Sequence, residues 1–148
     1  MSECLENGKG VIVLAATSNP EGASLQKATS NSETVAASIW RSLSELNAVT
    51  AGPAERFGSF GAVLGATLNL NGFGLQTVMQ GQPVSATPIL APGFGAQGAQ
   101  LSDSRQLFGA GSAQVIHSVS RSVLQAGSVG MPKAIEAAVA ELAAGLAN

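Results

Sequence analysis

A glycine-rich loop and one arginine are the residues of this chain whose types and spacing could bind an anion. The loop is Pro92-Gly93-Phe94-Gly95-Ala96-Gln97-Gly98, and it directly follows the apolar run from Pro88 to Ala91. Glycine reaches positive φ and has no Cβ to shield backbone N–H groups, so such a loop can present several donors to one phosphate. Arg121 ends the next β-like run, Val115 to Arg121. The pair predicts a phosphate site built from two consecutive strand ends.

Composition limits the classes of partner. The chain has 148 residues, of which 45% are hydrophobic, and this predicts a folded globular domain rather than a disordered one. Only 11% of its residues are charged and the net charge is −2. Without a basic stripe to neutralise a phosphate backbone, nucleic acid is not an expected partner. No two His, Asp, Glu or Cys residues show metal-ligand spacing, so a metal site is not expected.

The start of the chain and a long uncharged interval bear on location. Cys4 is the single cysteine and has no internal disulfide partner, so we interpret it as an ordinary thiol, and the charged segment 1–10 lacks the apolar core of a signal peptide. We therefore expect a cytoplasmic protein. No charged residue occurs between Arg56 and Asp103, but Gly, Asn, Gln and Pro interrupt this interval too often for a membrane span. Buried strands joined by glycine-rich loops are the better interpretation.

Strand-like and helix-like segments alternate along the chain. The first strand-like run is continuously apolar, which predicts a strand buried on both faces of a parallel sheet. In the first helix, apolar residues recur at spacings of three and four, and Trp40 falls on this apolar face as a core residue. The expected strands are Gly10 to Ala16, Phe60 to Thr67, Thr87 to Ala91 and Gln114 to Val119, and the expected helices are about Asn31 to Asn47, Leu75 to Met79, Leu101 to Phe108 and Pro132 to Leu146.

Four successive β/α units predict the α/β class, with parallel strands and right-handed crossovers. Four units are half of an eight-stranded barrel. In a TIM barrel the phosphate site is formed by the loops after the last two strands, and here the corresponding chemistry follows the third and fourth strands. We therefore predict that residues 1–148 form one domain, the C-terminal half of a (β/α)8 TIM barrel, with strands numbered five to eight.

Four motifs in order carry a resemblance to a known family. Together they closely resemble the C-terminal part of orotidine 5′-phosphate decarboxylase, in the bacterial subgroup typical of actinobacteria. The likeness covers the whole chain at plausible spacing. The motifs are Ala16-Thr17-Ser18-Asn19-Pro20-Glu21-Gly22-Ala23-Ser24-Leu25-Gln26, Leu64-Gly65-Ala66-Thr67, Leu90-Ala91-Pro92-Gly93-Phe94-Gly95-Ala96-Gln97-Gly98-Ala99 and Ser118-Val119-Ser120-Arg121.

The resemblance implies a set of substrate-binding residues. Ser18 matches the serine that hydrogen-bonds the pyrimidine, where a hydroxyl can both donate and accept. Gln97 matches the loop glutamine that reaches the phosphate and the base. Arg121 matches the phosphate-binding arginine, whose planar fork pairs with two oxygens at once. The backbone of the loop completes the implied phosphate cradle, at Gly95, Ala96 and Gly98.

The resemblance also implies an activity, the conversion of orotidine 5′-phosphate to UMP and CO₂ in pyrimidine biosynthesis, without metal or organic cofactor. In this family the chemistry depends on a Lys-Asp charge array on barrel strands two and three. Here Asp103 is the one aspartate, and Lys9, Lys27 and Lys133 lie outside any such motif. We therefore expect no catalytic residue in this chain and no activity of the chain in isolation.

Alternatives to the enzyme fragment remain open at this stage. The chain could be a non-catalytic half-barrel that binds a phosphate or nucleotide, or part of another enzyme of the ribulose-phosphate-binding barrel group. His117, the single histidine, lies in the middle of a strand and is interpreted as structural rather than as a base. A half-barrel leaves two strand edges and its apolar interior uncovered, which predicts a homodimer or a complementing N-terminal half as partner.

Overall fold

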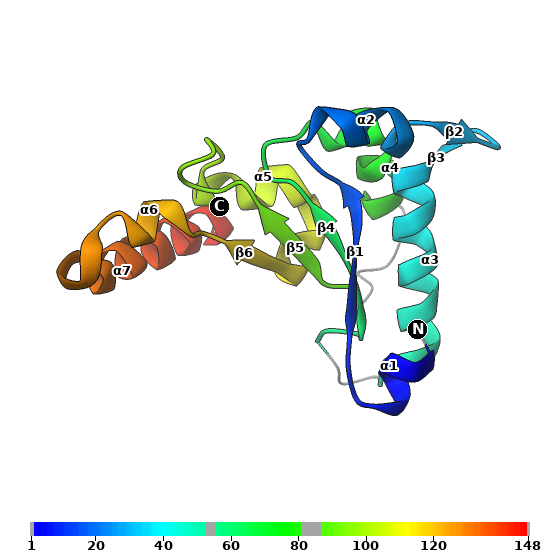
Figure 1. The fold of residues 1–148 in the computed structure, drawn as a ribbon, viewed down its shortest axis with the longest axis horizontal. Helices are drawn as coiled ribbons and strands as arrows, with labels where there is room; N and C mark the ends of the chain where they lie inside the picture. The colour runs from blue at the N-terminus through cyan, green and yellow to red at the C-terminus, as the bar shows by residue number, and fades with distance from the viewer. Residues whose placement is uncertain (1, 53–55, 81–86, 148) are drawn as a thin grey trace.

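The structure, a computed structural model, describes residues 2–52, 56–80 and 87–147. Its main sheet has four parallel strands in the order β1-β4-β5-β6. Within this sheet, each strand pairs with the strand that precedes it in the sequence. This confirms the predicted α/β class with four parallel strands (Figure 1). The bounds of the strands are β1 (Val11–Ala16), β4 (Phe60–Leu64), β5 (Ile89–Pro92) and β6 (Val115–Ser118).

Helices and short 3₁₀ helices fill the connections between these strands, and the longest helix lies at the C-terminal end. No helix in the described ranges is long and apolar enough to cross a membrane. The helices, with the 3₁₀ helices labelled η, are α1 (Ser2–Glu6), α2 (Pro20–Gln26), α3 (Val35–Thr50), η1 (Leu70–Phe73), α4 (Leu75–Gln80), η2 (Leu101–Asp103), α5 (Ser104–Phe108), η3 (Gly109–Gln114), α6 (Arg121–Leu124) and α7 (Gly127–Ala147).

The two faces of the sheet differ in burial. Strand register places one row of side chains on the face that packs into the core with the helices: Val13, Ala62, Ile89 and Val115. The next row, on the opposite face, consists of Leu14, Val63, Leu90 and Ile116. On this face of β1, Leu14 is 64% exposed and Ile12 44% exposed, so the prediction that the first strand is buried on both faces is wrong. No described part of the chain covers the Ile12 and Leu14 side of this apolar strand.

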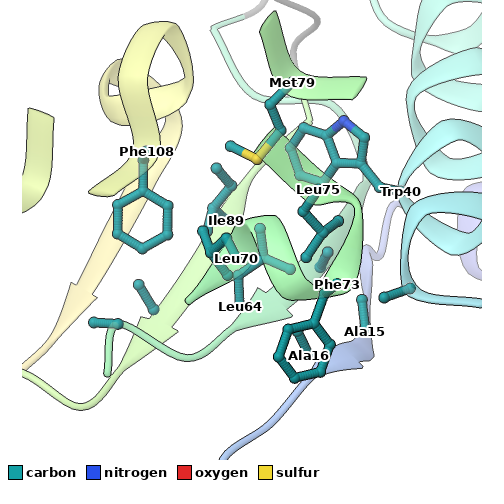
Figure 2. Packing of buried hydrophobic residues seen from close by; sticks show 14 of the residues in the cluster. Ala15, Ala16, Trp40, Leu64, Leu70, Phe73, Leu75, Met79, Ile89 and Phe108 are labelled. Carbon is teal, nitrogen blue, oxygen red and sulfur yellow. The ribbon is translucent and has the colours of Figure 1, made fainter. Parts of the chain in front are cut away.

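The hydrophobic core lies between the covered face of the sheet and the helices. Figure 2 shows Trp40 of α3 beside Met79 of α4, with Leu75 of α4 and Ile89 of β5 in the same cluster. Trp40 is buried, which confirms its assignment to the core. Phe108 closes the far side of the same cluster next to β5 and β6 (Figure 2).

A buried polar network fixes the amino ends of the central strands. Asn47 of α3 donates from Nδ2 to the carbonyl of Phe60 at 2.6 Å and to Thr87 Oγ1 at 3.0 Å, and its Oδ1 accepts from the Phe60 N–H at 3.1 Å. The Thr87 hydroxyl in turn donates to Ser44 at 3.2 Å. Because each of these groups is buried and hydrogen-bonded, the network ties α3 to the sheet at the end remote from the glycine-rich loop.

Two helix starts differ from the sequence expectation. The segment around Asn31 forms a hairpin of β2 (Thr29–Ser30) and β3 (Glu33–Thr34), and α3 begins only after Thr34, whose hydroxyl accepts from the Ala37 N–H at 3.1 Å. The competing local chemistry is the Asn31-Ser32 turn, in which both residues have positive φ. The terminal helix begins at Gly127 rather than at Pro132, which lies inside it.

Candidate functional site

The loops after β5 and β6 meet at the carboxyl end of the sheet and enclose a small pocket. Gly95 packs so closely on Ser122 that a Cβ added to Gly95 would lie 2.5 Å from the Ser122 hydroxyl oxygen. The pocket has a volume of about 100 Å³, comparable in size with a small anion rather than a whole nucleotide. It is lined by Pro92, Gly93, Phe94, Ala96, Gln97, Ser118, Ser120 and Arg121.

The glycine-rich loop is closed by its own backbone hydrogen bonds. The Gly95 N–H donates to Ala99 O at 2.8 Å, the Gly98 N–H to Gly95 O at 2.9 Å, and the Ala99 N–H to Gly93 O at 3.2 Å. Gly95 and Gly98 have φ of 68° and 108°, a region that favours glycine. Their N–H groups are therefore already engaged, and the two glycines shape the loop rather than line the pocket. Within the described chain, the N–H groups of Ala96 and Gln97 stay without a backbone acceptor.

Gln97 and Arg121 come together in this pocket from different loops. Both side chains are exposed, and neither makes a hydrogen bond or ion pair to a described residue. The structure adds two hydroxyls, those of Ser118 and Ser120, that sequence reasoning did not single out. The alternation of side chains along β6 could have pointed to Ser118, because Ser118 lies on the same face of the sheet as Ile116, two residues earlier. The pocket thus offers one cation, one amide and two hydroxyls, a donor set suited to phosphate.

Ser18 lies at the same end of the sheet but not in this pocket. It follows β1, which is three strand positions from β6, so at about 4.8 Å per strand the two loops are roughly 14 Å apart. Its neighbour Thr17 is clamped by Gln26, which donates from Nε2 to Thr17 Oγ1 at 2.8 Å and accepts from the Thr17 N–H at 3.0 Å. Thr17 Oγ1 also donates to Asn19 Oδ1. The clamp fixes the backbone on both sides of the exposed Ser18.

His117 supports the glycine-rich loop from the helix-covered face of the sheet. Its ring contacts that of Phe94 with centroids 5.2 Å apart, and its Nε2 lies 2.7 Å from the hydroxyl of the fully buried Ser104. Burial lowers the pKa of the His117 imidazole below its usual value of 6.5. Phe94 is itself buried, so this contact anchors the residue at the centre of the loop. The geometry agrees with a structural role for His117.

The far end of the loop is held by α7. Glu141 Oε1 accepts from the N–H of Leu101 at 2.7 Å and from that of Ser102 at 3.4 Å, where η2 begins. Gly145 lies directly against the Ser102 backbone, with no room for a Cβ. Arg105 donates to the carbonyl of Leu146 at 3.2 Å. The loop is therefore fixed at both ends before any ligand binds, which lowers the entropic cost of binding.

Comparisons with known proteins agree with this geometry. The chain is 46% identical over 121 residues to the orotidine 5′-phosphate decarboxylase of Salinispora arenicola, and 45% identical over 124 residues to that of Streptomyces coelicolor. The chain is related to orotidine 5′-phosphate decarboxylase. The resemblance drawn from the four sequence motifs is thereby confirmed. No family model matches the chain.

A solved structure extends the comparison to the fold. A crystal structure of a protein assigned as an orotidine 5′-phosphate decarboxylase, from Streptomyces avermitilis, matches 97% of this chain with a TM-score of 0.77 and 39% sequence identity. The match covers 47% of that protein, and the chain spans only 40% of the length of the Salinispora and Streptomyces coelicolor relatives. The chain thus has the fold of about half of an orotidine 5′-phosphate decarboxylase barrel.

Proposed function

We propose that this chain is the part of an orotidine 5′-phosphate decarboxylase that binds the phosphate and the pyrimidine of the substrate. The observation that carries the proposal is the single pocket formed by Gln97 and Arg121, from two loops, in a chain related to that enzyme. The complete enzyme would convert orotidine 5′-phosphate to UMP and CO₂. The relatives' names favour this enzyme over an unrelated phosphate-binding module.

Each residue has a stated role in the proposal. The Arg121 guanidinium pairs with two phosphate oxygens, and the Gln97 amide donates to a third. The N–H groups of Ala96 and Gln97, which have no backbone acceptor among the described residues, add donors from the loop, while Gly95 and Gly98 hold its shape. In this proposal Ser18, which follows β1 at the carboxyl end of the sheet, contacts the pyrimidine edge. A ligand that reaches both sites spans the carboxyl ends of all four strands.

Decarboxylation itself needs groups that the described site lacks. No lysine or aspartate lines the pocket of Gln97 and Arg121. Lys9 precedes β1 at the amino end of the sheet, Lys27 lies over the ring of Phe73 at 4.7 Å, and Lys133 is exposed on α7. We infer that the chain alone is inactive and that catalysis requires residues supplied from outside it. We also place the protein in the cytoplasm, with its nucleotide substrate.

Titration calorimetry of the chain with UMP and with uridine tests this function. The two ligands differ by the phosphate alone, so the proposal predicts clearly tighter binding of UMP, and competition by inorganic phosphate at millimolar concentration. Ribose 5-phosphate tests the remaining alternative, a general phosphate-binding module, because such a module would bind ribose 5-phosphate as tightly as UMP. Equal affinity for UMP and uridine would refute the phosphate site.

A further inference from the structure

His117 contacts both ends of the segment that carries the glycine-rich loop. At the beginning of the loop, its ring lies against that of Phe94, with the ring centroids 5.2 Å apart. Beyond the end of the loop, its Nε2 lies 2.7 Å from the hydroxyl oxygen of Ser104, the first residue of α5. Phe94 is 3% and Ser104 0% exposed, so both partners lie in the protein interior. One side chain of β6 therefore connects the two ends of residues 94–104.

The backbone hydrogen bonds of the loop do not fix its position relative to β6. They join residues 93–99 to one another, so they set only the internal shape of the loop. Gly95 packs against Ser122, in the loop after β6, but it has no side chain to hold that contact. The two contacts of the His117 side chain therefore connect the loop to the strand that leads to Arg121.

The backbone of His117 leads directly into the other side of the phosphate pocket. Ser118 follows it as the last residue of β6, and both Ser118 and Arg121 line the pocket. His117 itself pairs with Ala91 of β5, so the strand ladder holds its backbone in place. Its side chain is thus attached to a fixed point from which it can align the loop after β5 with Arg121.

The imidazole of His117 suits both of its contacts. Its ring is inclined by 45° to that of Phe94, a tilted arrangement of the kind that aromatic pairs favour. The hydroxyl of Ser104 is fully buried, and leaving such a group without a hydrogen bond would cost free energy. Burial lowers the pKa of His117 below 6.5, so the ring is neutral at neutral pH and keeps one donor and one acceptor nitrogen.

We propose that His117 is a positioning residue of the phosphate site, which connects residues 94–104 to β6 and thereby aligns the loop amides with Arg121. The described lining of the pocket does not include His117, so it acts through the loop and not by touching the ligand. Without this connection the loop moves relative to Arg121, and ordering it on binding costs free energy. The inference deepens the proposed function and rests on it for the identity of the ligand.

The first measurement is amide hydrogen exchange of the full chain without ligand, followed by NMR. In His117→Leu, the N–H groups of Gly95, Gly98 and Ala99 should exchange about tenfold faster than in the native chain, because the closed loop opens more often. The amides that pair β1 with β4 should keep their exchange rates, since His117 contacts neither strand. Unchanged exchange at the three loop amides would overturn the proposal.

The second measurement is titration calorimetry of UMP and uridine. His117→Leu is expected to weaken UMP binding about tenfold and to leave uridine binding unchanged. Ser104→Ala removes one buried oxygen and should weaken UMP binding in the same direction. In the double variant, Ser104→Ala should add no further loss, because the two side chains form one connection. His117→Gln, which keeps a hydrogen-bonding group for Ser104, should recover part of the affinity.

The matched control is Ser44→Ala. Ser44 is also a buried serine, and its hydroxyl accepts a hydrogen bond from Thr87 at 3.2 Å, at the amino end of the sheet. This variant should be less stable than the native chain and still bind UMP normally. If His117→Leu and Ser104→Ala behave in the same way, His117 is a packing residue and the proposal is wrong. If the loop amides exchange faster but the native chain does not bind UMP, the proposed function fails and the connection through His117 stands.

Discussion

Removing the Arg121 side chain should weaken UMP binding without harming the fold. Arg121 is exposed and makes no hydrogen bond to a described residue, so Arg121→Ala breaks nothing in the free protein. At about 4 Å, a unit charge pair contributes roughly 1 kcal/mol in bulk water and about 4 kcal/mol near a protein surface. The pocket is open to solvent, so the lower part of this range applies, and a hydrogen bond to a charged group contributes about 1.5–3 kcal/mol. We therefore expect a loss of about 2 kcal/mol, or about 30-fold in Kd.

The assay is titration calorimetry of UMP and uridine against the native chain and two variants. Arg56→Ala is the matched control, because it removes the same charge at the amino end of the sheet. Arg56 precedes β4 and hydrogen-bonds the carbonyl of Ala113, which precedes β6. Uridine affinity should be unchanged in both variants, since uridine lacks the phosphate. If Arg121→Ala and Arg56→Ala weaken UMP binding equally, the effect is long-range charge and the assignment of Arg121 is wrong.

Three other predictions follow from the same structure. The isolated chain should not consume orotidine 5′-phosphate above background in an absorbance assay, and turnover abolished by substituting Lys9, Lys27 or Lys133 would show that the active site is misplaced. Asn47→Ala leaves the Phe60 backbone groups unpaired and should lower the free energy of unfolding by about 3 kcal/mol in urea titrations, whereas exposed Asn7→Ala should change it little. Because burial lowers the pKa of His117, the unfolded state takes up a proton on this residue before the folded state does as pH falls below 6.5. The free energy of unfolding should therefore drop in that range. His117→Gln should remove that part of the pH dependence, and an unchanged profile would contradict the structural role of a buried His117.

The order of strands along the chain could be predicted from the sequence, but the burial of their two faces could not. Continuous apolar runs such as 10–16 indicate a parallel strand, but periodicity cannot say whether the layer that covers Ile12 and Leu14 lies in the same chain. Their exposure therefore became visible only in the structure. The helix starts were missed for a local reason, since a turn at Asn31-Ser32 and a helix cap use the same short polar residues.

The candidate site was predicted in part. Gln97 and Arg121 could be placed together because the carboxyl ends of neighbouring parallel strands share one edge of the sheet. The sequence could not show that the N–H groups of Gly95 and Gly98 are used inside the loop, because those hydrogen bonds depend on its closed conformation. The contributions assigned to these glycines and to Ser18 stay predictions until a ligand is observed.

The central claim is that the loops after β5 and β6 bind the phosphate of UMP. Its most direct test is a ¹H–¹⁵N NMR titration of the labelled chain with UMP, with uridine as the reference ligand. The account predicts that UMP, and not uridine, shifts the amide resonances of Ala96 and Gln97, together with the side-chain Nε–H of Arg121. In the part of the chain that the structure describes, those two N–H groups have no backbone acceptor. Amides at the amino end of the sheet, such as those of Gly58 and Ser59, should stay in place. Shifts confined to that end, or identical shifts with both ligands, would contradict the account.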